Sequence, residues 1–282
     1  MRNTQRSQKI AFFFLFLATL LIILPVGMIV VIIVQKGLPA INWQFLTDIP
    51  RQGMRSGGIF PAIIGTFYLV LGAIVFALPI GLLAAVYLSE YAKDNLLNRI
   101  IKLAIVNLSG VPSVVYGLFG LALFVVFLKF GASILSGSLT LGIMILPIII
   151  TTSREALESV PQSFREVSLS LGASKWQTIR HIVLPNAIPG ILTGTILGLG
   201  RAAGETAPIL FTVAAFYLPQ LPKSIFDQAM ALPYHLYVIS TQVPNVDEKV
   251  RYGTALVLLF LVLMMNLVAI IIRTNFRKKK KW

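Results

Sequence analysis

Residues 165–185 read REVSLSLGASKWQTIRHIVLP, a polar stretch of mixed charge between two long apolar runs. The chain has 282 residues, of which 57% are hydrophobic and only 12% are charged. A soluble globular domain carries about 25% charged residues, and it could not hide several apolar runs of this length in its core. The sequence therefore predicts an integral membrane protein that interrupts its apolar spans with a polar segment.

Six apolar runs are typical of transmembrane helices, because crossing the hydrocarbon core takes about 20 residues. The predicted spans are residues 10–34, 59–88, 103–128, 138–152, 187–216 and 252–272. Several spans contain proline, which predicts kinked helices whose freed carbonyl groups must be satisfied by neighbours. These prolines are Pro25, Pro79, Pro112, Pro147 and Pro208. The predicted fold class is all-α, with six transmembrane helices.

The distribution of Lys and Arg predicts the orientation. If the N-terminus is inside, the inner segments hold 16 basic residues, the outer segments hold 7, and Arg201 lies within a span. The inner segments are then residues 1–9, 89–102, 153–186 and 273–282. The positive-inside rule places both termini, and the quoted stretch, in the cytoplasm. Because much of the +14 net charge adjoins the first and last spans, it favours a membrane surface over nucleic acid.

The predicted spans divide the chain into three parts. Residues 1–58 comprise an anchor span and a first outer loop, residues 59–272 a transmembrane domain, and residues 273–282 a basic cytoplasmic tail. The first apolar run is far longer than the roughly 7–15 residues of a signal-peptide core, and no small-residue cleavage site follows it. We therefore expect it to remain as an uncleaved anchor.

Several kinds of chemistry are disfavoured by the residues present. The chain has no cysteine, which excludes disulfides and thiolate metal sites. His181 and His235 have no partners at metal-ligand spacing, so neither a metal site nor a cofactor is predicted. No Ser/His/Asp set or pair of catalytic carboxylates occurs within the predicted spans. The sequence does not predict an enzyme.

Two short amphipathic helices are predicted within residues 155–186. Apolar residues recur at helical spacing up to Gly172, which supplies a C-terminal stop. Ser174 followed by Gln177 forms a capping-box pattern that opens a second helix, and Pro185 is expected to end it. Acidic and basic residues are mixed here, so attraction to anionic lipid would be weak. The pattern favours a docking element for another protein over a helix pair lying on the bilayer.

A spaced motif in this stretch resembles the EAA motif of ABC-importer permeases. A glutamate, five residues, a glycine and nine residues are followed by Ile-x-Leu-Pro. The resemblance assigns ATPase coupling to Glu166, Val167, Ser168, Gly172, Ala173, Ser174, Ile182, Leu184 and Pro185. Val167 and Ser168 stand where the family usually has alanines. The resemblance implies a type I ABC-importer permease fold and a coupling element that inserts into a cleft of a cytoplasmic ATPase. Since the chain lacks G-x-x-x-x-G-K-[ST], that ATPase would be a separate polypeptide.

The segment GLGRAAGETAPILF, residues 198–211, places Arg201 and Glu205 four residues apart in the fifth predicted span. A charge at bilayer depth costs about 2.5–3.5 kcal/mol, so such residues face a cavity or a partner. The pair is either a structural salt bridge or part of a translocation path. Arginine is an expected oxyanion ligand. Glu205 would neutralise Arg201 or accept a proton carried on the substrate, which favours hydrogen phosphate over sulfate.

Other polar groups lie at the predicted membrane depth and outside it. Ser113 and Tyr116, just after Pro112, either face the path or pack against the second span. The outer segments 35–58 and 217–251 carry aromatic residues, and each is either a surface for a binding protein or a cover packed on the spans.

Three further segments resemble phosphate-importer permeases: GGIFPAIIGTFYLV (57–70), LSGVPSVVYGLFGL (108–121) and RAAGETAPIL (201–210). GETAPIL, together with ALPYHLY at 231–237, resembles the A-type subunit more than its C-type partner. The resemblance implies half of a phosphate path in a bacterial or archaeal plasma membrane. It also implies a heterodimer with a C-type permease, two ATPase subunits and an extracytoplasmic phosphate-binding protein. The candidate path residues are Arg201, Glu205, Thr206 and Ser113.

Three alternatives stay open at this point. A permease for another oxyanion, sulfate or molybdate, is disfavoured by GETAPIL. An autonomous channel or ion-coupled transporter would need no ATPase and no docking helices. A membrane-embedded enzyme is disfavoured by the lack of a catalytic set in or beside the spans.

Overall fold

The computed structural model describes the backbone of residues 2–278 and the side chains of residue 8 and residues 11–277. The side chains of most of the basic N-terminal segment, and the end of the predicted basic tail from Lys279 onward, lie outside the described residues. The longer helices are α1 (Arg2–Gly37), α3 (Phe60–Val86), α4 (Leu96–Ser109), α6 (Ile134–Glu158), α9 (Leu184–Gly204) and α12 (Glu248–Lys278). The shorter helices and strands are α2 (Trp43–Thr47), β1 (Pro50–Arg51), β2 (Ser56–Gly57), α5 (Ser113–Gly120), α7 (Gln162–Ser170), α8 (Lys175–Thr178), α10 (Ala207–Thr212) and α11 (Leu232–Thr241).

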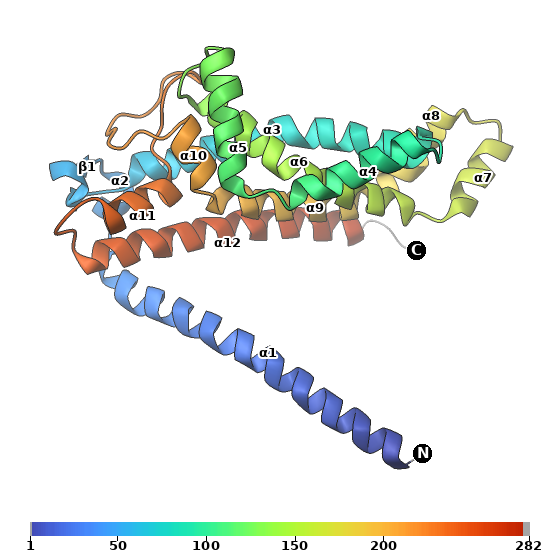
Figure 1. Ribbon diagram of the computed structural model, residues 1–282, viewed down its shortest axis with the longest axis horizontal. Helices are drawn as coiled ribbons and strands as arrows, with labels where there is room; N and C mark the ends of the chain where they lie inside the picture. Colours follow the sequence, from blue (N-terminus) through green and yellow to red (C-terminus); the bar gives the residue numbers. More distant parts are fainter. Residues whose placement is uncertain (1, 279–282) are drawn as a thin grey trace.

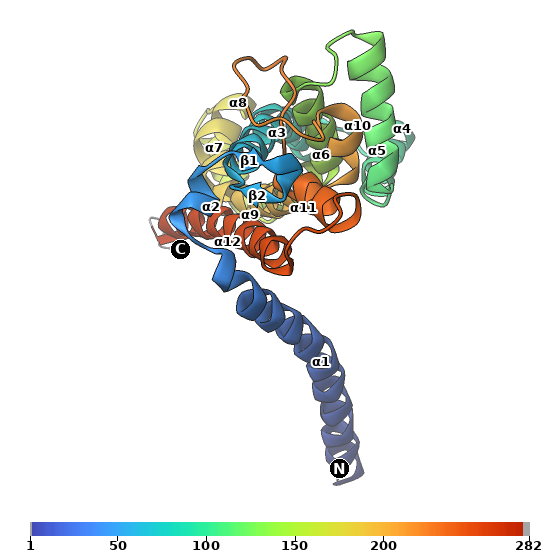
Figure 2. The ribbon, with the colours of Figure 1, turned by 90° about the vertical axis from the view of Figure 1, so that its left-hand side faces the viewer.

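The body of the molecule is a layered bundle of long helices. α6 packs between α3 and α9, and α12 packs on the other side of α9 (Figure 1). The C-terminal end of α1 contacts α12, and the N-terminal part of α1 projects away from the body, as Figure 2 also shows. A Cβ atom at Gly37 would lie 2.6 Å from the carbonyl oxygen of Tyr252, so this junction depends on glycine.

Among residues 2–278, five helical stretches are long and apolar enough to cross a membrane, and a sixth is the bent pair of α4 with the helix Ser113–Phe127. The prediction of an all-α protein with about six spans is confirmed. The third span, however, is not one kinked helix over residues 103–128. The chain bends by 102° between its two halves. Pro112 has extended backbone and no N–H to donate, so the helix ends before it.

The fourth span is longer than the predicted residues 138–152. α6 begins at Ile134, after the capping residue Ser133, whose side chain accepts a hydrogen bond from the Ser136 N–H, and it continues through Pro147 to Glu158. Pro147 does not end the helix because α6 is buried between two neighbours, where Leu141, Met144 and Ile145 are fully buried.

The fifth span is broken, and this corrects the predicted continuous helix over residues 187–216. α9 ends at Gly204, Glu205 is extended, and the chain resumes as α10. The cause is Pro208, whose ring would clash with the carbonyl group four residues earlier, that of Gly204.

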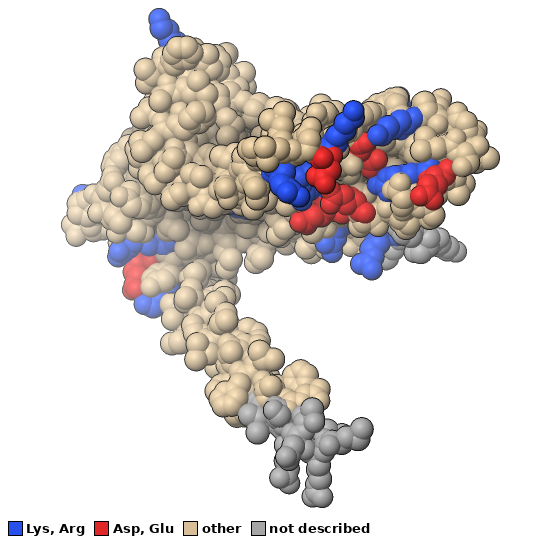
Figure 3. Space-filling model, turned by 45° about the vertical axis from the view of Figure 1, so that its right-hand side comes forward, with Lys and Arg blue, Asp and Glu red and all other residues tan. Residues whose placement is uncertain are grey.

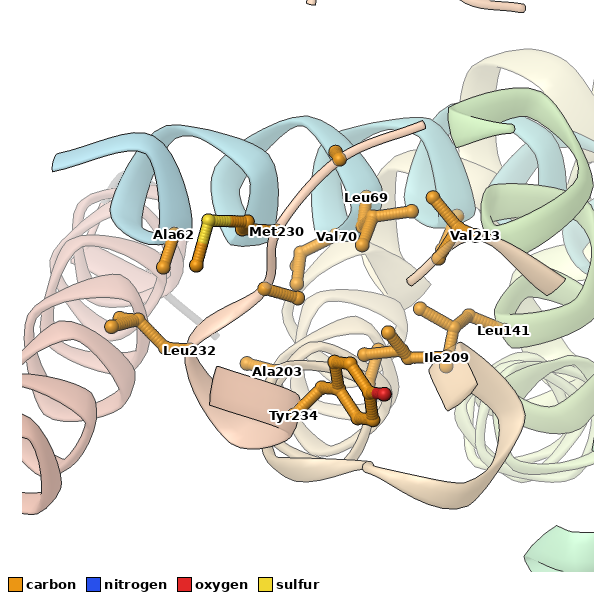
Figure 4. Close-up of a cluster of buried hydrophobic side chains, with 14 of the residues drawn as sticks. Ala62, Leu69, Val70, Leu141, Ala203, Ile209, Val213, Met230, Leu232 and Tyr234 are labelled. Carbon is orange, nitrogen blue, oxygen red and sulfur yellow. The ribbon is translucent and has the colours of Figure 1, made fainter. Parts of the chain in front are cut away.

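A hydrophobic cluster fills the body around this break. The side chains drawn in Figure 4 include members from α3, α6, α9, α10 and α11 and from the segment between α10 and α11. The labelled members are Ala62, Leu69, Val70, Leu141, Ala203, Ile209, Val213, Met230, Leu232 and Tyr234. Gly65 lets the Met230 backbone lie directly against α3, since a Cβ atom there would collide with the Met230 carbonyl oxygen. Residues 229–235 of the predicted outer segment 217–251 are therefore packed on the spans, whereas residues 220–228 are mostly exposed.

Charged side chains gather at the end of the body that carries α7 and α8, with a smaller group where α1 joins the body (Figure 3). The N-terminal end of α1 and the C-terminal end of α12 also point towards the side of the molecule that carries α7 and α8 (Figure 1). This arrangement agrees with the positive-inside assignment of that end to the cytoplasm, which stays a prediction.

Candidate functional site

The two predicted short helices are present. Their docking role stays a prediction, and after that predicted role we call α7, the following turn and α8 (residues 162–178) the coupling element. α7 follows Pro161 and ends at Ser170. Gly172 then takes a φ of +83°, a left-handed conformation that disfavours residues with a Cβ atom. The Ala173 N–H donates back to the Ser168 carbonyl oxygen at 3.2 Å and closes the turn. The predicted stop at Gly172 is confirmed.

The capping box that opens α8 is also confirmed. The Ser174 hydroxyl accepts from the Gln177 N–H at 3.3 Å, and the Gln177 side-chain oxygen accepts from the Ser174 N–H at 2.7 Å. A further contact, missed by sequence reasoning, joins the two helices. The buried hydroxyl groups of Ser168 and Thr178 share a hydrogen bond of 2.8 Å. The coupling element is thereby held as one unit.

Pro185 does not end the second helix, and this prediction is wrong. α8 passes into a π-helical turn, Ile179–Val183, and then directly into α9. The Leu184 N–H donates to the Ile179 carbonyl oxygen, five residues back. Because this π-helical turn shifts the hydrogen-bond register just before Pro185, the helix continues although Pro185 has no N–H to donate. Consequently α8, the π-helical turn and the membrane helix α9 form one continuous helix.

The exposed and buried faces of the coupling element differ from a simple surface helix pair. At its tip, around the turn between α7 and α8, apolar side chains are exposed among polar ones, and Leu171 is 83% exposed. The other exposed apolar side chains of the tip are Val167, Leu169 and Trp176. Beneath it, Ile179 and Val183 are buried in a second hydrophobic cluster with residues of α3 and α6. An exposed apolar tip on a packed base is suited to docking against another protein.

Among the coupling residues implied by the EAA resemblance, Glu166, Gly172 and Ser174 are exposed, whereas Ser168 is buried. Ala173, Ile182, Leu184 and Pro185 are half-buried. The motif therefore spans both the outer surface of the element and its attachment to the body.

Arg201 and Glu205 lie at the break in the fifth span. The Arg201 Nε and the Glu205 Oε1 are 3.5 Å apart, and their side chains are 30% and 19% exposed. Arg201 is in the last turn of α9, where the carbonyl end of the helix favours a cation. Glu205 stands just past the helix end, so the predicted pairing is confirmed but the pair does not share one continuous helix. Within the described chain, no other carboxylate lies within 4.0 Å of Arg201, which leaves guanidinium donors open to a ligand.

Thr206 directly follows the break and precedes α10, and its side chain makes no capping hydrogen bond. Ser113 opens α5 and lies one turn before Gly117, on the same helix face. That face packs on α10, since a Cβ atom at Gly117 would lie 3.0 Å from the Pro208 Cα. The structure thus brings α5 to α10, but no described hydrogen bond joins Ser113 to Arg201 or Glu205. The Tyr116 hydroxyl donates to the Leu108 carbonyl oxygen at 2.7 Å, which ties α5 to α4.

Asn266 of α12 is a polar neighbour that sequence reasoning missed. A Cβ atom at Gly200 would lie 3.4 Å from both amide heavy atoms of Asn266, so this side chain reaches α9 one residue before Arg201. Its Oδ1 is buried and has no hydrogen-bond partner within the described residues. A lone amide in the last apolar span was the available signal.

A multi-span helical fold, a helix pair that resembles the EAA region and a sequence without a nucleotide-binding motif are together typical of the permease subunit of an ABC importer. Residues 77–282 match the family described as binding-protein-dependent transport system inner membrane component, and the chain belongs to this family. It is therefore a multi-pass membrane subunit of a transporter and not an enzyme.

Two relatives and one solved structure illustrate the likeness. The phosphate transport system permease protein PstA 1 of Mycobacterium tuberculosis (strain ATCC 25618 / H37Rv) is 33% identical over 280 residues, covering 98% of this chain and 90% of the relative. The probable phosphate transport system permease protein PstA of Methanocaldococcus jannaschii is 35% identical over 259 residues, covering 91% and 90%. A bacterial ABC transporter involved in the import of the acidic polysaccharide alginate has the same fold, with a TM-score of 0.60 and 17% identity over 94% of this chain and 96% of that one. The resemblance to A-type phosphate permeases is confirmed.

Proposed function

We propose that this chain is the PstA-like permease subunit of an ATP-driven phosphate importer and forms half of its translocation path. The observation that carries the proposal is the partly exposed Arg201 at a break within a membrane span, with guanidinium donors that no described protein group occupies. A planar fork of donors matches the oxygens of phosphate. The relatives named PstA support the same substrate.

Glu205 gives the site a basis for selecting a protonated oxyanion. Its carboxylate, 3.5 Å from the Arg201 Nε, balances the arginine charge when no substrate is bound. Hydrogen phosphate can donate its proton to a Glu205 oxygen while its other oxygens accept from Arg201. Sulfate has no proton to donate at neutral pH, so its charge would meet the ionised carboxylate directly. Thr206 and Ser113 are proposed as further hydroxyl groups along the path.

The coupling element would deliver the force of ATP hydrolysis to this site. Its exposed apolar tip docks on the ATPase, and α8 continues without interruption into α9, which carries Arg201. The continuous helix from Lys175 to Gly204 has 30 residues, which gives a length of about 45 Å at 1.5 Å per residue. A displacement of α8 by the ATPase therefore reaches the Arg201–Glu205 break through a continuous helix, the expected basis of alternating access.

The proposal requires partner chains. A PstC-like C-type permease would supply the other half of the path, two PstB-like subunits would hydrolyse ATP, and a PstS-like extracytoplasmic protein would deliver phosphate. The absence of a P-loop motif from this chain supports a separate ATPase.

The test is uptake of labelled phosphate at micromolar concentration in cells with and without this chain, competed by sulfate and molybdate. We expect chain-dependent uptake that only phosphate or close analogues suppress. Suppression by sulfate or molybdate would instead indicate another oxyanion permease. Uptake that persists when the ATPase is inactivated would indicate an ATPase-independent channel or an ion-coupled transporter. Uptake unaffected by deletion, in cells without a duplicate phosphate system, would refute the phosphate assignment.

A Glu205→Gln variant tests the selectivity argument in the same assay. The amide keeps the size of the side chain but removes the charge that repels a fully ionised anion. We expect phosphate uptake to fall and competition by sulfate to rise. Unchanged competition would show that Glu205 does not discriminate between the two anions.

A further inference from the structure

Arg165 directly precedes the motif residue Glu166, yet its side chain turns inward and is only 12% exposed. Its Nη2 lies 2.7 Å from the Glu90 Oε1, and its Nε lies 3.2 Å and 3.3 Å from the two Glu90 oxygens. Glu90 is itself only 7% exposed. A buried, forked contact of this kind is strong and geometrically specific.

The same guanidinium group also binds the end of α6. Its Nη1 donates to the Val160 carbonyl oxygen at 2.7 Å, and its Nη2 donates to the Leu157 carbonyl oxygen at 2.8 Å. Carbonyl groups at a helix C-terminus lack intrahelical donors and favour a cation. One side chain of the coupling element thus joins α6 to the segment that holds Glu90.

Glu90 belongs to a π-helical turn, Tyr87–Tyr91, that directly extends α3. The second helix of the coupling element, α8, also contacts this turn. The Lys175 Nζ lies over the Tyr91 ring, 4.9 Å from its centre. Both helices of the coupling element therefore hold the inner end of α3. The helix that continues from α8 into α9 also packs against α3, through Ile179 and Val183 in the second hydrophobic cluster, but the buried ion pair to α3 is made by Arg165 of α7.

We propose that Arg165 is a positioning residue that transmits the movement of the coupling element to α3 and α6 by clamping Glu90. Three membrane helices would then respond to one movement of the ATPase by two means: α9 through helix continuity, and α3 and α6 through the contacts of Arg165. Because Ser168 and Thr178 hold the element as one unit, the two outputs move together. Without the clamp, α3 follows α9 only through apolar packing, and the path opens incompletely. This inference rests on the proposed ATP-driven function.

The test compares variants in the assembled importer, reconstituted with its ATPase, second permease and binding protein. Phosphate moved per ATP hydrolysed is the readout, because a smaller amount of folded complex does not change that ratio. For Glu90→Gln and for Arg165→Lys we expect the ratio to fall at least about fivefold, the lower end of typical coupling between sites. Glu158→Gln is the matched control, since Glu158 is 48% exposed and its partner Arg154 lies 3.6 Å away at the same end of α6. That control should stay at the wild-type ratio.

Rescue by a covalent link separates transmission from simple destabilisation. The chain has no cysteine, so the double variant Glu90→Cys/Arg165→Cys presents the only thiols of this subunit. The adjoining cavity of about 380 Å³, lined by both residues, leaves room for a short bifunctional methanethiosulfonate reagent. We expect the uncoupled double variant to regain its transport ratio when linked and to lose it again on reduction, with the wild-type complex treated in parallel.

Wild-type ratios for Glu90→Gln and Arg165→Lys, or a linked double variant that stays uncoupled, would overturn the clamp. If the single variants fail to assemble, the linked double variant still tests the proposal. A link that restores assembly but not the ratio of phosphate moved to ATP hydrolysed also overturns the clamp. If the wild-type complex itself moves no phosphate with ATP, the proposed function fails, and that outcome is distinct from failure of the clamp alone.

Discussion

The turn at Gly172 allows a prediction whose magnitude follows from the structure. Gly172 has a φ of +83°, and no atom lies within 4 Å of the position a Cβ atom would take. Gly172→Ala therefore introduces no clash, only the backbone penalty of a left-handed residue, about 1–2 kcal/mol. A penalty of that size lowers the population of the native turn by about five- to thirtyfold relative to its alternatives. Gly172→Asn should be milder, since asparagine tolerates this conformation better.

Gly53 provides a matched control for the backbone penalty. It has a φ of +64°, again with nothing within 4 Å of a Cβ position, but it lies in the first outer loop. We expect Gly53→Ala and Gly172→Ala to lower the thermal stability of the purified chain similarly. Only Gly172→Ala should reduce binding-protein-stimulated ATP hydrolysis and uptake in the assembled complex. Normal stimulation in a Gly172→Ala complex that is destabilised like the Gly53→Ala complex would refute the role of this turn in coupling.

Three further outcomes are expected. Arg201→Ala should abolish phosphate uptake while the complex still co-purifies, and loss of assembly would favour a structural salt bridge. Thr178→Val leaves the buried Ser168 hydroxyl without its partner and should cost about 1–3 kcal/mol in unfolding free energy, whereas Ser170→Ala, at an exposed hydroxyl, should cost little. Burial lowers the pKa of His235, in α11 outside the spans, to about 4. Because the unfolded chain binds the proton first, stability should fall as pH drops from about 6.5 towards 4, by up to about 1.4 kcal/mol per pH unit. Thermal unfolding at several pH values checks this, and a His235→Phe variant with the same pH dependence would contradict it.

Local signals in the sequence predicted much of the coupling element. The Gly172 stop and the Ser174–Gln177 capping box depend on residues within one turn of each other, so they can be recognised without knowledge of the fold. Pro185 shows where this reasoning fails. Proline removes one hydrogen bond, but whether the chain stops there or widens into a π-helical turn depends on the packing of Ile179 and Val183 beneath it.

The membrane spans show the same division. Their presence follows from apolar length, because the bilayer requires it of any spanning helix. From the sequence, Pro112, Pro147 and Pro208 were all predicted to kink the helices that contain them. In the structure α6 runs through Pro147, whereas the chain bends by 102° near Pro112 and unwinds before Pro208.

Taken by itself, the sequence predicted an all-α membrane protein with a capped pair of short helices and a charged pair in its fifth span, because apolar length, capping and i,i+4 spacing are properties of contiguous residues. The permease family was indicated by the resemblance of its motifs. Only the tertiary structure decided that the Arg201–Glu205 pair sits at a helix break, that Asn266 lies beside it, and that Arg165 clamps Glu90. Arg165 and Glu90 are 75 residues apart, and their contact forms only when α3, α6 and α7 pack together. Burial makes the loss of either partner costly, because the other charge is left unpaired, and burial is produced by the whole fold.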